Sequence, residues 1–153
     1  LFGHRSFRPP VHIPHVTDCV VRLLETQRIG GILYDPFQYV AEAQRLAEQG
    51  HERILQEINQ GALMIEIGSN LESHIQRGSY LAYEDKERRA QYSWCGAKAT
   101  ERGYRIQKMS QTKPVDVVVA EAMALWGCTQ DLSFVAHPSF SESHHSVSLL
   151  ELP

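Results

Sequence analysis

Apolar residues recur along the chain in two spacings, one typical of helices and one of short buried strands. The run "ILY", residues 32–34, follows two glycines and predicts a short buried strand. Before it, a helix with Thr17 or Asp18 as its N-terminal cap is expected to end near Arg28. Its apolar positions have helical spacing: Val16, Val20, Leu23 and Leu24. The start of the chain, Leu1 to Arg8, predicts an extended strand, followed by a proline-rich loop to Pro14.

The same two patterns continue through the middle of the chain. A second helix is expected from Phe37 to Gln49, with Gly50 as its C-terminal cap and an apolar face formed by Val40, Ala43, Leu46 and Ala47. Residues 52–58 predict a strand. A third helix then follows Gly61 and ends at Gly78, with an apolar stripe formed by Met64, Ile67, Leu71 and Ile75.

Three further elements are expected before the last helix. Residues 79–84 and 103–109 are strand candidates, and residues 86–95 predict a short helix. The last helix covers residues 113–127, with Pro114 at its first position and Gly127 just past its end. Three consecutive valines, 117–119, would alone indicate a strand. The length of the segment and its alanines favour a helix that is buried on most of its surface.

Strands that alternate with helices of about a dozen residues indicate βαβ units, and therefore an α/β fold. We expect a largely parallel or mixed sheet with helices packed against it. Residues 1–127 are predicted to form one domain, and the polar residues 128–153 a C-terminal tail.

Composition narrows the classes of protein that fit this pattern. The chain is 42% hydrophobic and 22% charged, as expected for a soluble globular protein, and its formal net charge of −3 means that nucleic-acid binding would need a local basic patch. Three scattered cysteines indicate neither a disulfide framework nor a zinc knuckle, which favours a reducing, cytoplasmic setting. No apolar stretch approaches the roughly 20 residues of a membrane helix, so no membrane partner is expected.

Two aspartates lie at positions where proteins often bind ligands, one at the end of a strand and one at the start of a helix. Asp35 directly follows the buried strand 32–34, and Asp116 lies in the first turn of the last helix, where the helix dipole favours an anion. If that helix packs near the strand, the carboxylates converge and remain ionised together only with a cation between them. Carboxylate oxygens suit Mg²⁺ or Mn²⁺. Simpler roles stay open, a turn or helix cap for Asp35 and compensation of the helix dipole for Asp116.

Four segments in order carry a resemblance to a known family: "GHRSFRP", "GGILYDPFQYVAEAQRLAEQG", "LESHIQRGSYLAYED" and "KPVDVVVAEAMALWG". Together they resemble the C-terminal nuclease domain of the large terminase subunit of tailed bacteriophages, over roughly residues 1–127. Each segment is common by itself, and their order and spacing carry the likeness.

The resemblance implies an RNase H-like fold, with a mixed sheet flanked by helices, that cuts concatemeric double-stranded DNA during viral packaging. It implies two divalent ions, Mg²⁺ or Mn²⁺, one of which generates the attacking hydroxide while the other stabilises the leaving oxygen. Asp35 matches the family's second acidic position, which anchors or bridges the metals, and Asp116 matches the last, which completes the shell. The implied partners are double-stranded DNA, a terminase ATPase domain, a small subunit and a portal, in the cytoplasm of an infected host cell.

One part of the family pattern is missing from this sequence. The first acidic residue of the family lies on a strand upstream of the element that "GHRSFRP" resembles, so we expect the chain to begin after that strand. Two carboxylates are too few for a two-metal centre. Asp18, Glu25 and Glu121 are poor replacements, because the first two lie on a helix expected outside the sheet and Glu121 is about 140° around the last helix from Asp116.

Basic residues concentrate between positions 86 and 113. Lys108 and Lys113 flank the approach to Asp116, and together with Arg105 they are the predicted contacts to DNA phosphates. A solvated charged surface is the alternative interpretation. His4, His12 and His15 fit no zinc-binding spacing.

Two other functional classes remain open. The chain fits a non-catalytic RNase H-like binding or structural module, and it fits another RNase H-like nuclease such as a resolvase or transposase core. It contains no Gly-x-x-x-x-Gly-Lys-Ser/Thr loop, so this stretch is not itself an ATPase motor.

Overall fold

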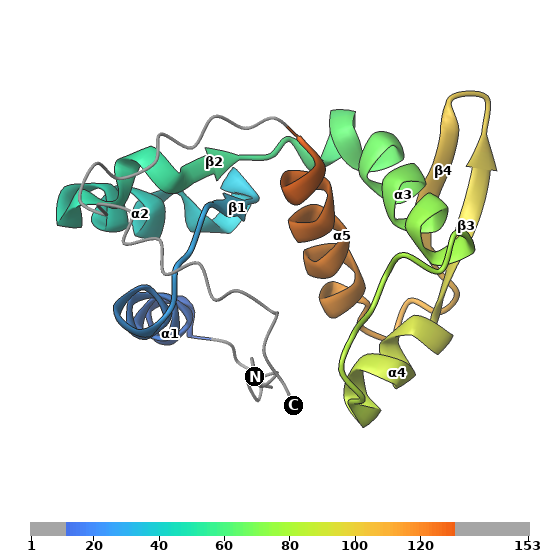
Figure 1. The fold of residues 1–153 in the computed structure, drawn as a ribbon, viewed down its shortest axis with the longest axis horizontal. Coiled ribbons are helices and arrows are strands. Elements are labelled where there is room, and N and C mark those ends of the chain that lie inside the picture. The colour runs from blue at the N-terminus through green and yellow to red at the C-terminus, as the bar shows by residue number, and fades with distance from the viewer. Residues whose placement is uncertain (1–11, 131–153) are drawn as a thin grey trace, which may run out of the picture.

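The structure, a computed structural model, describes residues 12–130 apart from the side chain of Ala62. The predicted strand over Leu1–Arg8 and nearly all of the predicted tail lie outside these residues. The elements follow in the order α1 (Ile13–Thr26), β1 (Ile32–Tyr34), α2 (Pro36–Leu46), the π-helical turn η1 (Ala47–His51), the 3₁₀ turn η2 (Glu52–Ile54), β2 (Leu55–Glu57), α3 (Gln60–Gln76), α4 (Lys86–Ser93), β3 (Cys95–Thr100), β4 (Gly103–Lys108) and α5 (Asp116–Thr129) (Figure 1).

The described chain has a mixed α/β architecture with two small sheets. β1 and β2 pair in parallel, with Leu33 opposite Gln56, and α2 connects them. β3 and β4 form an antiparallel hairpin. The predicted βαβ unit is therefore confirmed. Within residues 12–130 the strands form two separate two-stranded sheets, where the sequence predicted one sheet.

β1 lies between two helices. Successive side chains of a strand point to opposite faces, and here Leu33 faces α5 while the ring of Tyr34 lies 5.9 Å from the ring of Tyr39 on α2. The contact with α5 is close, because a Cβ atom on Gly127 would stand 3.0 Å from both terminal carbons of Leu33. Glycine at this position lets the helix approach the strand.

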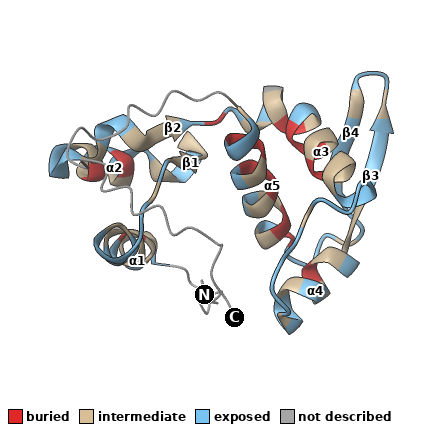
Figure 2. Cartoon of the chain, in the orientation of Figure 1, coloured by how far each residue is buried: buried red, intermediate tan, exposed pale blue. Residues whose placement is uncertain are grey.

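The hydrophobic core joins α3, α5 and the residue that follows β2. It consists of Ile58, Met64, Ile67, Leu71, Val118, Ala122, Met123 and Trp126. Figure 2 shows buried residues along α3 and α5, and others in α2, in α4 and after β2. The apolar stripe predicted for the third helix is confirmed at Met64, Ile67 and Leu71, whereas Ile75 at its end is 49% exposed.

The hairpin packs on the outer side of α3. A Cβ atom on Gly68 would stand 2.6 Å from the backbone oxygen of Tyr104, so the helix and β4 touch through their backbones. The backbone N–H of Tyr104 donates to Ser69 Oγ at 2.8 Å, and the neighbouring Gly103 has a φ of +132°. These three small residues set the distance between hairpin and helix.

The first helix begins earlier than predicted. It begins at Ile13, with Pro14 in its first turn, where the fixed φ of proline suits a helix. Thr17 is therefore an interior residue of α1. It is fully buried and its hydroxyl lies 3.1 Å from the hydroxyl of Tyr39, which explains a polar residue that the sequence suggested as a cap. The prediction that Pro14 belongs to a loop is wrong.

Other elements also differ from the sequence prediction. The last helix, α5, begins at Asp116, so Pro114 lies before the helix and not at its first position. Residues 79–84 form no strand, and Leu81 is 92% exposed there, so the alternation of this segment does not reflect a buried face. β3 was not predicted, because Cys95–Thr100 lacks apolar alternation and acquires its strand conformation by pairing with β4. Gly127 lies inside α5, where it contacts Leu33, and does not end the helix. The predicted helix at 86–95 and strand at 103–109 are confirmed as α4 and β4.

Candidate functional site

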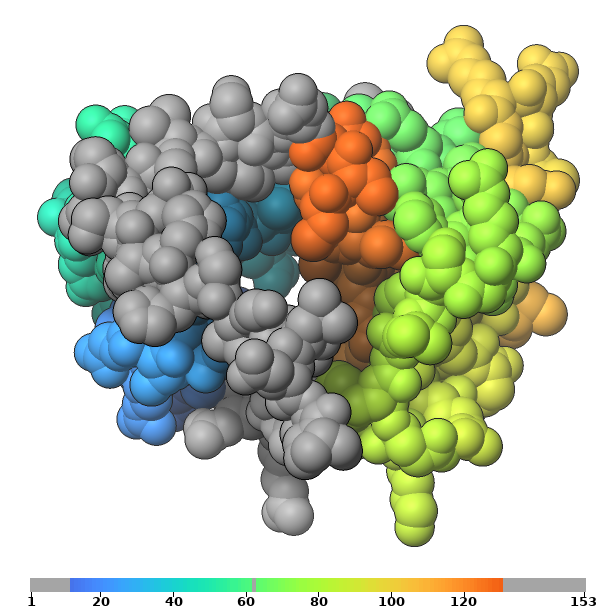
Figure 3. Space-filling view, viewed as in Figure 1, coloured from blue at the N-terminus to red at the C-terminus, as the bar shows by residue number. Residues whose placement is uncertain are grey.

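A groove of about 1030 Å³ runs between β1 with its preceding loop and the face of α5 that is turned toward them. The α5 residues on this wall have helical spacing: Asp116, Val119, Ala120, Met123, Ala124, Gly127 and Cys128. In the space-filling view a hollow lies beside α5, on the side of the blue residues of α1 and β1 (Figure 3). Small side chains on α5 leave room for the groove.

Asp35 lines this groove and also caps α2. Its Oδ1 atom accepts a hydrogen bond of 3.0 Å from the backbone N–H of Phe37, and Pro36 occupies the first helical position. Asp35 therefore caps a helix, which is one of the roles that the sequence analysis left open for it. It uses one carboxylate oxygen, and within residues 12–130 the other oxygen, Oδ2, has no hydrogen-bond partner.

Asp116 is the first residue of α5, and its exposed side chain lines the same groove. The N-terminus of a helix carries a partial positive charge that stabilises a nearby carboxylate. No ion pair or hydrogen bond to the Asp116 carboxylate occurs within the described residues.

Both predicted aspartates therefore belong to one groove. Asp35 follows Leu33 by two residues, and Leu33 touches Gly127 in the last turns of α5. Asp116 opens that helix eleven residues earlier, a rise of about 16 Å along the helix axis. Joint coordination of a single ion by the two carboxylates stays a prediction.

The carboxylate oxygens of Asp35 and Asp116 are the type of ligand that a hard divalent cation prefers. In number they do not complete a two-ion centre, since Asp35 and Asp116 are the two acidic residues on the described lining. Between residues 12 and 130, no group of three or more His, Cys, Asp and Glu side chains is placed to hold a metal ion. Asp18, which the sequence already disfavoured as a ligand, is paired with Arg45 at 3.6 Å.

The three predicted phosphate-binding residues separate in the structure. Lys108, at the end of β4, lines the groove. The ammonium of Lys113 lies 4.8 Å from the centre of the Trp94 ring, in a cation–π contact. Arg105 is exposed on the hairpin, opposite Lys98. Of the three, only Lys108 is on the groove lining.

Sequence reasoning missed three polar residues of the lining: Arg28, Gln60 and Gln130, the last being the C-cap residue of α5. Arg28 was assigned to the end of the first helix, but α1 ends at Thr26, so Arg28 belongs to the loop before β1. Its position just ahead of two glycines and a strand was the available signal. Gln60 opens α3, and its Nε2 lies 3.8 Å from the sulfur of Met123.

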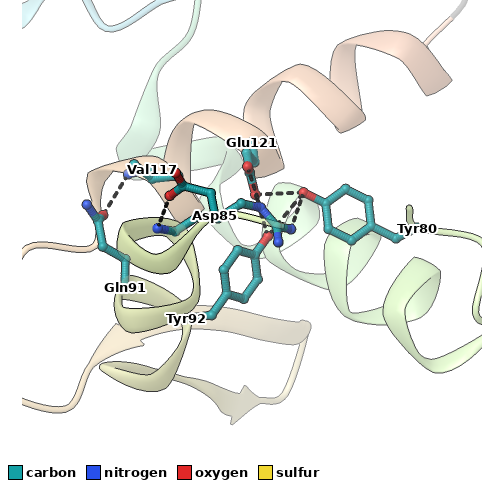
Figure 4. A network of polar contacts seen from close by, with 7 residues as sticks. Tyr80, Asp85, Gln91, Tyr92, Val117 and Glu121 are labelled. Atoms are coloured by element: carbon teal, nitrogen blue, oxygen red, sulfur yellow. Dashed lines mark hydrogen bonds and ion pairs between the residues drawn. The ribbon is translucent and has the colours of Figure 1, made fainter. Parts of the chain in front are cut away.

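On the other side of α5 a polar network ties that helix to α4 (Figure 4). The carboxylate of Glu121 accepts hydrogen bonds from Arg88 Nε at 2.7 Å, from the Tyr80 hydroxyl at 2.6 Å and from the Tyr92 hydroxyl at 2.8 Å. The guanidinium of Arg88 also lies 4.7 Å from the centre of the Tyr92 ring. Glu121 is engaged in this network and is not on the described groove lining, in agreement with its predicted position.

Burial determines the protonation of this network. Desolvation and the hydrogen bonds within the network raise the pKa of Tyr92 far above its ordinary value. Burial, followed by the hydrogen bond to Glu121, also raises the pKa of Tyr80. Both hydroxyls therefore remain protonated donors to the carboxylate of Glu121, which also accepts the hydrogen bond from Arg88 Nε.

Comparison with known proteins gives no match to this chain among protein-family models, curated proteins or solved structures. None of the helices within residues 12–130 is both long enough and apolar enough to cross a membrane.

Proposed function

We propose that this chain is a metal-dependent DNA endonuclease domain of the terminase type, with an RNase H-like fold. The observation that carries the proposal is the groove, which unites Asp35, Asp116 and Lys108 from β1, α5 and β4. These residues are far apart in the sequence and were selected from it as metal ligands and a phosphate contact. The order of the four resembling segments and the β1–α2–β2 unit also support the proposal.

Asp35 and Asp116 would supply oxygen ligands to Mg²⁺ or Mn²⁺, and Lys108 would contact a DNA phosphate at the same groove. Bound divalent ions in such a site activate water and neutralise the leaving oxygen. Asp116 lies in the first turn of α5, at the positive end of the helix dipole. The cap on α2 fixes the orientation of the Asp35 carboxylate while leaving its second oxygen available.

A two-ion site needs more carboxylates than these two. Within residues 12–130, β1 pairs with β2 alone, and a strand added to the other edge of β1 would lie next to Asp35. The resemblance implies an acidic residue on such a neighbouring strand. We therefore expect the 153-residue chain to cut DNA feebly or not at all, and a longer chain that includes the preceding acidic strand to cut it. Double-stranded DNA, an ATPase domain, a small subunit and a portal in an infected host cell are the partners that this proposal implies.

A second candidate is a non-catalytic RNase H-like binding module. The hydrogen bond from Phe37 to Asp35 favours it, because helix capping accounts for that aspartate without a metal. A resolvase-like or transposase-like core would share the groove with the leading proposal and differ in its DNA substrate.

Metal binding by the chain separates the two candidates. We expect Mn²⁺ to broaden the backbone amide resonances near residues 35 and 116 in NMR spectra. Asp35→Asn and Asp116→Asn should each weaken Mn²⁺ binding about tenfold, because each removes one ligand charge. Glu48→Gln is the matched control, since this exposed carboxylate lies off the groove lining and its loss should leave binding unchanged.

Cleavage of plasmid DNA with Mn²⁺ then tests the activity. In the chain extended by the acidic strand, Asp35→Asn and Asp116→Asn should abolish cutting while the protein remains folded. Robust cutting by the 153 residues alone would show that another ligand completes the site. Equal Mn²⁺ binding by the original chain and both variants would reject the nuclease proposal in favour of the binding module.

A further inference from the structure

Helix α5 begins without a cap of its own. Its N-cap residue is Val115, which has no side-chain hydrogen-bonding group and is 2% exposed. The first four backbone N–H groups of an α-helix have no acceptor within the helix. Buried donors without a partner are costly, so the first turn of α5 needs an acceptor from elsewhere in the molecule.

Gln91 on α4 supplies that acceptor. Its Oε1 atom accepts a hydrogen bond of 3.0 Å from the backbone N–H of Val117, the residue that follows Asp116 (Figure 4). Gln91 is 4% exposed, and it is one of two buried polar residues in the described part of the chain. A buried amide side chain therefore performs the capping role across the interface between two helices.

A second bond sets the register of this interface. Arg88 lies three residues before Gln91 on α4, and its Nε bonds Glu121, four residues after Val117 on α5. One turn along α4 thus corresponds to one turn along α5, in the opposite direction. The ion pair holds the middle of α5, while Gln91 holds its first turn.

We infer that Gln91 is a positioning residue for Asp116, holding the first turn of α5 so that the aspartate faces the groove. The functional purpose of this positioning rests on the proposed function of Asp116. The hydrogen bond between Gln91 and Val117 is present whatever that function is. An amide suits the position because it accepts the bond without placing a second negative charge beside Asp116. An aspartate or glutamate cap would add such a charge and compete for a bound cation.

Hydrogen exchange of the Val117 amide tests this role directly. In the unsubstituted chain this amide should exchange at least about tenfold more slowly than the amide of Asp116, although both lie in a first helical turn. Gln91→Met has a similar length and shape but lacks the amide oxygen, and it should lower the protection of Val117 by about tenfold. Gln91→Glu retains the acceptor and should restore the protection.

Glu121→Gln serves as the matched control. It weakens the same interface between α4 and α5 but leaves the contact between Gln91 and Val117 in place. Under a merely structural role for Gln91, both variants would change metal binding equally. We expect Gln91→Met to weaken Mn²⁺ binding at Asp116 about tenfold, and Glu121→Gln to leave it within about twofold at a temperature where both are folded.

The outcomes separate this inference from the proposed function. Unchanged Val117 exchange in Gln91→Met, or equal Mn²⁺ affinities of Gln91→Met and the original chain, would overturn the inference. If the original chain binds no Mn²⁺, the proposed function fails, and the exchange data alone then decide whether Gln91 holds the first turn of α5.

Discussion

At the scale of single residues, Asp35 combines a structural and a candidate functional role. One oxygen caps α2 through Phe37, and the carboxylate also lines the groove. A cap requires an acceptor, whereas a metal ligand at this position requires charge as well. The two requirements can be separated because asparagine meets the first and not the second.

Replacement of Asp35 should therefore give two different results. Asp35→Ala removes the acceptor and should lower the free energy of unfolding by about 1 kcal/mol, while Asp35→Asn should change it by only a few tenths. Urea denaturation followed by circular dichroism measures both. The same Asp35→Asn protein should bind Mn²⁺ about tenfold more weakly than the original chain. If it instead lost stability as the alanine variant does, the capping bond would depend on charge.

At the scale of elements, glycines decide how closely the helices approach the strands. Gly68 brings the backbone of α3 against β4, and Gly127 brings α5 against β1. These contacts differ in kind, since Gly68 faces a backbone oxygen and Gly127 faces the movable end of the Leu33 side chain. The first cannot be relieved by a side-chain rotation.

Gly68→Ala should consequently destabilise the protein by about 2–3 kcal/mol, because its new Cβ would lie 2.6 Å from the backbone oxygen of Tyr104. Gly61→Ala in the same helix is the control. Its Cβ would stand 3.2 Å from the side-chain oxygen of Asn59, and it should change the free energy of unfolding by less than about 0.5 kcal/mol. Thermal or urea denaturation of both variants measures the difference. Equal stability of the two would show that α3 and β4 can move apart.

At the scale of the whole molecule, α5 connects the groove to the rest of the protein. One side of the helix lines the groove, a second side packs into the core with α3, and a third carries Glu121 into the network with α4. The network brings together segments that follow α3, form α4 and belong to α5. Its protonation should therefore affect global stability.

Alkaline pH should reveal this dependence. Burial raises the pKa of Tyr80 and Tyr92 above their ordinary value of 10.0, and burial also raises that of Tyr39. The native state thus keeps protons that the unfolded state releases, so stability is fully present below about pH 10 and falls as the pH rises further. Urea midpoints measured from about pH 8 to about pH 11 should show this fall. A protein with both Tyr80→Phe and Tyr92→Phe should show a smaller fall, and an identical one would place the titrating groups elsewhere.

Local patterns predicted much of the fold. The strand at residues 32–34 and the helix stripe of Met64, Ile67 and Leu71 follow from spacing and local propensity. The short helix predicted at 86–95 is present at residues 86–93. β3 was missed, and residues 79–84 were wrongly predicted to form a strand. Both errors have one reason, namely that a strand depends on its pairing partner as well as on its own alternation. The interior position of Gly127 was likewise unpredictable, because it depends on the approach of Leu33.

For the candidate site, the sequence alone selected Asp35, Asp116 and Lys108, since strand ends, helix starts and basic segments are local features. It could not determine that the three line one groove, or that Arg28 and Gln60 join them, because these relations depend on how β1 and α5 pack. The tertiary structure also determined which partners three charged side chains have. Lys113 contacts the ring of Trp94, and Arg88 pairs with Glu121, and in both contacts the partners are distant in the sequence. The sequence selected the candidate residues from local features, and packing determined which of them share a surface.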